Sequence, residues 1–171
     1  SSAASDVYKR QDDGSVAWAG IGQYTDQITA IQFLRFMGVI ANGGEAAEPY
    51  LMQKISRAGQ TVYEAETKTT GRLLSEETAE ALGKMMRGAV VNQYGAWQFG
   101  SLTVCAKSGT AERENGPADA MFAGFVEDEA YPLAFVVFAE RGGSGSQTAA
   151  PIAAKVLAAC KTMLDTPNPN G

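Results

Sequence analysis

The sequence contains no histidine, and this absence excludes several kinds of active site. A serine–histidine–aspartate triad cannot form within these 171 residues, because the imidazole that accepts the serine proton is missing. Imidazole-ligated metal sites are excluded for the same reason. The two cysteines, Cys105 and Cys160, lie far apart in apolar surroundings and lack the spacing of metal ligands. We therefore expect no metal or other cofactor, and two buried free thiols, with a disulfide as the alternative.

Positive charge and long apolar runs are also scarce. The formal net charge is −5, and the basic residues are interspersed with acidic ones, which argues against a nucleic-acid-binding face. No apolar run approaches the roughly 18 residues that a membrane span needs, and no secretory signal pattern is present. The length and the hydrophobic fraction of 45% suit one globular domain with a real core.

The first residues show neither helical nor strand periodicity. They are small and polar and surround a short charged patch at Lys9–Asp13. We predict that residues 1–17 are a disordered leader or a cloning remnant, that 18–165 form the folded part, and that 166–171 are a tail.

Three helices are predicted from start signals and apolar periodicity. Thr29 and Gln32 have the spacing of a capping box, before a helix over about 30–41. Ser75, followed by two glutamates, predicts the start of a second helix. A last helix is predicted over about 148–164, with Ile152, Val156, Cys160 and Met163 as its apolar face.

Strand signals predict a hairpin and then a meander. The hairpin strands are expected near 50–56 and 61–66, and the meander strands at 102–112, 121–127 and 133–140. Both alternating sets of side chains in the last strand are apolar, so we expect it to be covered on both faces. The predicted fold class is α+β, an antiparallel sheet flanked by helices.

Two segments are predicted to be loops. Residues 92–100 contain Tyr94 and Trp97, which are expected either to line the rim of a cleft or to pack on the core. Residues 142–146 are glycine-rich and are interpreted as a flexible connector before the last helix.

The strand at 102–112 ends in Lys107-Ser108-Gly109-Thr110, which resembles the Lys-Thr/Ser-Gly box of penicillin-binding proteins and serine β-lactamases. Further segments match the transpeptidase domain of penicillin-binding proteins in the same order, from about residue 20 to residue 163. The resemblance is strongest to the class B, high-molecular-weight enzymes. The matching segments are Gly22-Gln23, the helix ending in Ala41–Gly44, Pro49-Tyr50-Leu51, Leu74–Glu77, Phe122–Phe125 and Pro151–Ala153.

The resemblance implies an acyl transfer that cross-links peptidoglycan stem peptides and is inhibited by β-lactams. Lys107 and the backbone N–H of Thr110, an oxyanion donor, would be catalytic groups. Ser108 would bind the substrate carboxylate, and Gly109 and Thr110 would let the substrate lie along the strand. The alternative for Lys107 is a solvated lysine at a strand end. The parent protein would work on the extracytoplasmic face of a bacterial membrane, tethered by an anchor that this chain lacks.

The sequence departs from the family at its two other active-site boxes. No lysine has a serine three residues before it, and no asparagine has one two residues before it, so neither Ser-x-x-Lys nor Ser-x-Asn is present. Ser108 has no neighbouring base that would make it a nucleophile. We therefore expect the C-terminal part of a transpeptidase domain, inactive alone. The alternatives are a non-catalytic binding or structural module, and a β-lactamase or β-lactam sensor.

The resemblance also has a consequence for assembly. In the family, two further strands pair beside the strand that corresponds to 133–140. We expect the edge of that strand to be open here, which favours a homodimer through the sheet edge.

Overall fold

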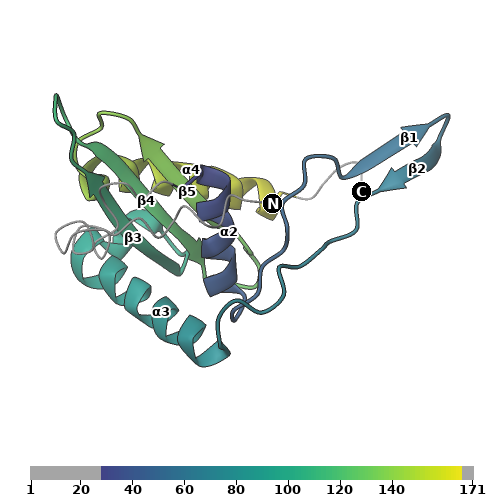
Figure 1. Cartoon of the computed structure of the whole chain (residues 1–171), viewed down its shortest axis with the longest axis horizontal. Coiled ribbons are helices and arrows are strands. Elements are labelled where there is room, and N and C mark those ends of the chain that lie inside the picture. Colours follow the sequence, from purple (N-terminus) through teal and green to yellow (C-terminus); the bar gives the residue numbers. More distant parts are fainter. Residues whose placement is uncertain (1–27, 167–171) are drawn as a thin grey trace, which may run out of the picture.

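The computed structural model describes residues 28–166, so the predictions for the leader, the Gly22-Gln23 turn and residues 167–171 lie outside the described part. Strands β3 (Val104–Ala111), β4 (Asp119–Val126) and β5 (Ala134–Ala139) form an antiparallel sheet in the order β3-β4-β5. Short turns join consecutive strands, which confirms the predicted meander (Figure 1).

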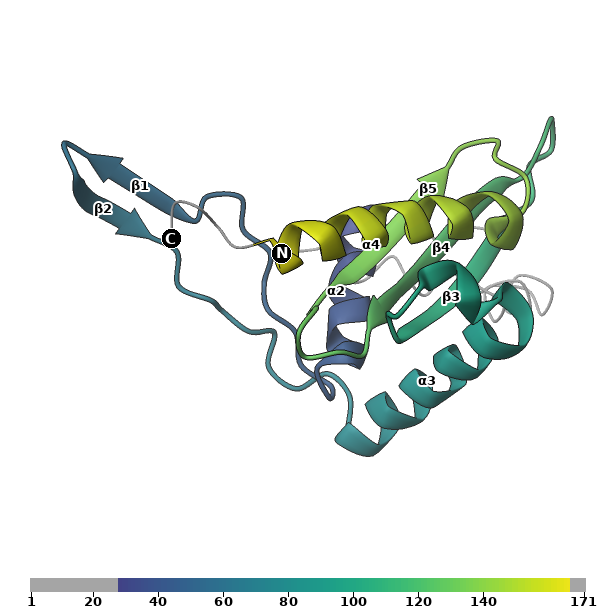
Figure 2. The ribbon, with the colours of Figure 1, turned by 180° about the vertical axis from the view of Figure 1, so that it is seen from behind.

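Helices cover both faces of this sheet. Helices α2 (Ala30–Ala41) and α3 (Glu76–Ala89) lie on one face, and α4 (Ala150–Asp165) lies across the other (Figures 1 and 2). Each face has its own core. The α4 face is built around a completely buried Phe122, whereas Cys105 and Phe125 join the helices on the opposite face. The predicted α+β class is confirmed.

Strand β5 is less completely covered than predicted. Phe135 belongs to the core beneath α4, and Ala134 and Val136 pack against the core of the opposite face. Phe138, however, is 52% exposed. The prediction that both faces of this strand are covered is therefore confirmed for its start and is wrong near its end.

The predicted apolar face of the last helix is wrong. Ile152, Val156 and Met163 are 41%, 51% and 76% exposed. The residues that α4 buries are instead small ones and a single leucine: Ala150, Ala153, Ala154 and Leu157. Alanines let the helix approach the sheet closely, and the aromatic rings of the sheet then fill the space that larger helix side chains would need.

The cysteine prediction holds only in part. Both thiols are free, and Cys105 is completely buried, but Cys160 is only partly buried.

The helix starts were predicted correctly. The Thr29 hydroxyl accepts from the Gln32 N–H and the Gln32 side chain reaches back, so the capping box is present. The Ser75 hydroxyl accepts from the Thr78 N–H at the start of α3. These contacts are local in sequence, which is why the sequence alone reveals them.

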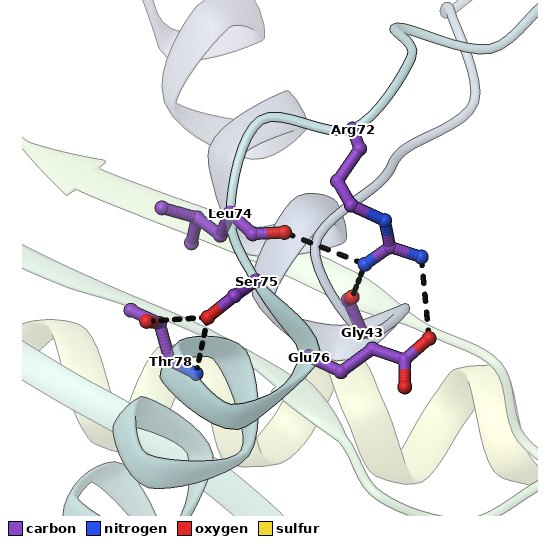
Figure 3. A network of polar contacts seen from close by, with 6 residues as sticks. All are labelled: Gly43, Arg72, Leu74, Ser75, Glu76 and Thr78. Atoms are coloured by element: carbon purple, nitrogen blue, oxygen red, sulfur yellow. Dashed lines mark hydrogen bonds and ion pairs between the residues drawn. The ribbon is translucent and has the colours of Figure 1, made fainter.

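An arginine joins the end of α2 to the start of α3 (Figure 3). Arg72 donates to the carbonyl oxygens of Gly43, at 2.7 Å, and Leu74, at 3.4 Å. Its other terminal nitrogen lies 3.2 Å from the Glu76 carboxylate. The guanidinium thus ties the turn that ends α2 to the first turn of α3 and fixes how the two helices enter the same face of the sheet.

A two-stranded hairpin projects away from this body (Figure 1). It consists of β1 (Lys54–Arg57) and β2 (Gln60–Glu64), which pair antiparallel around Ala58 and Gly59. The hairpin was predicted, although its first strand begins four residues later than expected. All residues of both strands are exposed.

The two segments predicted to be loops contain helical turns. Residues 90–99 form η1 (Val90–Tyr94), a π-helical turn, and η2 (Ala96–Phe99), a 3₁₀ turn. A further π-helical turn, η3 (Gly145–Ala149), leads into α4 and buries Gly145. Within residues 28–166, no helix is long and apolar enough to cross a bilayer.

Candidate functional site

The candidate site is the second half of β3, where the strand emerges from the core. Residues Val104 to Ala106 are completely buried, and exposure begins at Lys107. Lys107 pairs with Ala123 and Ser108 with Phe122 on β4. Among the described strands β3 is an edge of the sheet, so alternate backbone groups of β3 point away from β4. This edge can therefore offer backbone hydrogen bonds as well as side chains.

Ser108 is held by Tyr94, a residue for which the sequence allowed either a place at the rim of a cleft or packing on the core. Its backbone N–H donates to the Tyr94 phenol oxygen at 3.1 Å, and its hydroxyl donates to the same oxygen at 3.0 Å. The Tyr94 ring packs edge-on against Phe122, with centroids 5.3 Å apart and an interplanar angle of 81°. Tyr94 thus both packs on the core and reaches the candidate site, whereas Trp97 is 84% exposed and does not pack on the core.

Lys107 lies on the exposed surface beside this contact. Its ammonium group donates to the Ser108 carbonyl oxygen at 2.8 Å. Across the part of the chain that the structure describes, Lys107 forms no ion pair with a carboxylate. Its positive charge therefore remains uncompensated close to Ser108, as an anionic ligand would require.

The neighbouring Ser108 and Lys107 change the pKa of the Tyr94 phenol. Burial of the ring opposes ionisation and by itself would raise the pKa of the phenol. The hydrogen bonds from Ser108 and the positive charge of Lys107 outweigh it, so the pKa of Tyr94 is lowered from its usual value. The edge beside Ser108 thus favours negative charge on an oxygen atom.

Gly109 and Thr110 meet the start of η3. The Thr110 hydroxyl accepts from the Gly145 N–H at 3.2 Å. A Cβ on Gly145 would lie 2.3 Å from the Gly109 carbonyl oxygen and 2.4 Å from that of Met121, so only glycine fits there. By strand alternation, the Thr110 N–H lies on the same edge as the Ser108 N–H. The predicted oxyanion donor is therefore on the edge that the candidate site uses.

The opposite end of β3 has different chemistry. The Cys105 thiol lies 3.7 Å from a Glu127 carboxylate oxygen. Burial, reinforced by this carboxylate, raises the pKa of Cys105 from 9.0 to about 12, although Arg87 acts in the opposite sense. A cleft of about 640 Å³ lies near this end and is lined by residues of α2 and of the β4–β5 turn, Glu127 to Glu129 included. Because Val104 pairs with Val126, that cleft lies at the far end of the strands from Ser108.

The described residues offer no group of three or more cysteine, aspartate or glutamate side chains that could hold a metal ion. The chemistry of the candidate site is that of hydroxyl, ammonium and backbone N–H donors.

Most of the chain matches a known protein family. The profile of the penicillin-binding protein transpeptidase domain matches residues 2–158. The chain belongs to this family. Peptidoglycan D,D-transpeptidase PbpA of Mycolicibacterium smegmatis is 29% identical over 160 residues, and PbpA of Mycobacterium tuberculosis is 30% identical over 163 residues. Each alignment covers 86% of this chain and 32% of the relative, so the chain spans about a third of their length.

Solved structures of penicillin-binding proteins have the same fold. Penicillin-binding protein A of M. tuberculosis superposes with a TM-score of 0.79 as its ceftriaxone acyl-enzyme complex, at 27% identity over 87% of this chain and 36% of that one. Its imipenem acyl-enzyme complex gives 0.80, at 26% identity, over 88% and 34% of the two chains. The D,D-transpeptidase domain of an Eggerthella lenta peptidoglycan glycosyltransferase gives 0.73, at 27% identity, over 88% and 38%.

The structure places all four predicted site residues of this penicillin-binding protein domain on the second half of β3, where Lys107 and Thr110 are exposed and Ser108 and Gly109 are half-buried. Sequence reasoning missed the contact between Tyr94 and Ser108, and it missed the closeness of Gly145 to Gly109. Each pair is separated by many residues in sequence. The glycine-rich segment before the last helix was a signal for the second contact, but a connector explained it equally well.

Proposed function

We propose that this chain is the part of a peptidoglycan D,D-transpeptidase that binds the carboxylate end of stem peptides and of β-lactams. The observation that carries the proposal is the second half of β3, where Lys107 and Ser108 place an ammonium group and a hydroxyl side by side. Among the residues that the structure describes, no carboxylate forms an ion pair with Lys107. A carboxylate accepts hydrogen bonds and is attracted by such donors.

Each residue of the box has a distinct role in this proposal. Lys107 supplies positive potential, and Ser108 donates to the ligand carboxylate. Gly109 allows the ligand to lie along the strand edge, and the Thr110 N–H is one donor of the oxyanion hole. The hydroxyl of Thr110 is engaged by Gly145, which supports a backbone rather than a side-chain role.

Acyl transfer also needs a nucleophile, and these 171 residues contain no Ser-x-x-Lys box. In the complete reaction a serine attacks the carbonyl of a D-Ala-D-Ala peptide, D-alanine leaves, and an amine takes up the acyl group. The chain alone supplies binding groups and oxyanion stabilisation, so it binds such ligands without forming an acyl-enzyme.

The place of the protein in the cell follows from the same proposal. The curated relatives are peptidoglycan transpeptidases, which belong to the bacterial envelope. We propose that the parent protein acts on the extracytoplasmic face of the membrane, where its substrate lies.

We further propose that the chain forms a homodimer through the edge of β5. Among the described strands, β5 pairs only with β4, and Phe138 near its end is 52% exposed. An unpaired strand edge with apolar side chains favours pairing with another chain. Light scattering should give twice the chain mass at high concentration, and a monomer at all concentrations would contradict the dimer.

Incubation of the isotope-labelled chain with excess benzylpenicillin tests the binding proposal. The amide signals of Lys107 to Thr110 should shift, and the intact mass should stay unchanged. The Lys107→Gln and Ser108→Ala variants should weaken the response. A stoichiometric penicilloyl adduct would mean that a nucleophile is present in this chain, and shifts that avoid β3 would overturn the proposed site.

A further inference from the structure

Tyr94 makes contacts that a purely structural tyrosine would not need. It comes from η1, after α3, and reaches the edge of β3 at Ser108. Both polar hydrogens of Ser108, on the backbone nitrogen and on the hydroxyl, are directed at the one phenol oxygen. This oxygen therefore fixes the rotamer of the side chain that is proposed to bind the ligand carboxylate.

The phenol itself is held firmly. Its ring packs edge-on against the completely buried Phe122, which is also the cross-strand neighbour of Ser108. The Gln98 side chain donates to the Tyr94 carbonyl oxygen and secures the backbone as well. The ring cannot leave Ser108 without giving up an aromatic contact in the core, so Tyr94 is a fixed part of the edge rather than a movable plug.

The phenol proton of Tyr94 is available for a hydrogen bond to a ligand. The phenol oxygen accepts both bonds from Ser108, so these bonds do not use the phenol's own proton. A carboxylate is an acceptor only, and it would accept this proton as well as the attraction of Lys107. The lowered pKa of Tyr94 is consistent with carboxylate binding, because the Ser108 and Lys107 groups that stabilise a phenolate oxygen here would also stabilise a carboxylate.

On the basis of the proposed function, we infer that Tyr94 is a specificity-determining residue of the carboxylate site: it holds the Ser108 side chain in one rotamer and supplies an O–H donor of its own for the carboxylate of the ligand. The Ser108 hydroxyl has a single proton, so it donates to the ligand only after rotation about its Cβ–Oγ bond turns that proton from Tyr94 to the carboxylate. Nothing in the Lys-Ser-Gly-Thr box contains this group. It comes from a separate element that the fold brings to the box.

The test is a titration of the whole 171-residue chain, followed by amide NMR, with N-acetyl-D-alanyl-D-alanine and with its C-terminal amide as the probe that lacks the carboxylate. Tyr94→Phe removes the phenol oxygen and keeps the ring on Phe122. Tyr131→Phe is the matched control, because Tyr131 donates to Asp165 at 2.6 Å, far from Ser108 in the fold. Melting temperatures check that both variants remain folded.

We expect Tyr94→Phe to weaken binding of the acid about fivefold while leaving the amide nearly unchanged, and Tyr131→Phe to change neither. The χ1 coupling constants of Ser108 should become averaged in Tyr94→Phe, which a loss of packing alone would not produce. Unchanged or tighter binding of the acid would overturn the inference, and tighter binding would identify the phenol as a plug.

Failure of the proposed function would look different. If the wild-type chain bound acid and amide equally, the carboxylate site itself would be wrong, and the inference would fall with it. If Ser108→Ala lost the preference for the acid but Tyr94→Phe kept it, only the inference would fail.

A second measurement does not depend on the folding of Tyr94→Phe. In a ¹³C-tyrosine pH titration, Tyr94 should ionise at a lower pH than free tyrosine, and Ser108→Ala should raise its pKa. A pKa of Tyr94 that does not respond to Ser108→Ala would contradict the contact on which the inference rests.

Discussion

The two halves of β3 have the same partner strand but opposite surroundings. Val104, Cys105 and Ala106 lie beneath helices on both faces of the sheet and are completely buried. From Lys107 onward the same strand keeps its register with β4 while its side chains become exposed or half-buried. The buried half fixes the position of the strand, and the ladder to β4 carries that position into the polar half. A rigid, polar strand edge is thereby offered to a ligand.

Substitution of Gly145 or Gly109 tests whether packing of η3 supports the second half of β3. Gly145→Ala would place a methyl group against two backbone carbonyls, and we expect it to destabilise the fold by about 3 kcal/mol. Gly109→Ala should cost about 1 kcal/mol, because its closest obstacle is the flexible end of Met121. Urea unfolding of both variants measures the difference. Equal losses would mean that η3 does not pack on β3 as described.

Substitutions in the two halves of the strand should have very different effects on folding. Val104→Ala removes buried methyl groups and should lower the free energy of unfolding by about 2 kcal/mol. Lys107→Gln removes an exposed charge and should change it by less than about 0.5 kcal/mol, although it should weaken ligand binding. Chemical denaturation would contradict the division of roles if Lys107→Gln were the more destabilising change.

The smallest expected effect concerns the thiol in the buried half. The pKa of Cys105 is raised to about 12, so the folded state keeps its proton where the unfolded thiol loses it. Stability from this group is complete below pH 9 and is lost as the pH rises toward 12. The stability difference between wild type and Cys105→Ala should therefore shrink over that range.

Thiol labelling provides the corresponding kinetic check. At neutral pH a disulfide reagent should label Cys160 in the folded chain and Cys105 only on unfolding, because Cys105 is both buried and protonated. Equal labelling rates for the two cysteines in the folded chain would contradict the burial of the first half of β3.

The features that the sequence predicted are local ones. The caps at Thr29 and Ser75 depend on residues three positions apart, and the box at Lys107 to Thr110 is contiguous. The face of α4 was misjudged because hydrophobicity favours large side chains, whereas close packing on aromatic rings selected Ala153 and Ala154. The contact between Tyr94 and Ser108 could not be predicted from the sequence. The two residues are 14 positions apart, and the contact depends on how η1 packs against the edge of β3.

The most direct test of the account is the affinity of the wild-type chain for benzylpenicillin compared with that for its methyl ester, which keeps the ring system but lacks the carboxylate. If Lys107 and Ser108 form a carboxylate site, the acid should bind at least about tenfold more tightly, and Ser108→Ala should remove most of the difference. Equal affinities for acid and ester in the wild-type chain would show that the exposed half of β3 does not recognise a carboxylate, and the proposed function would be wrong.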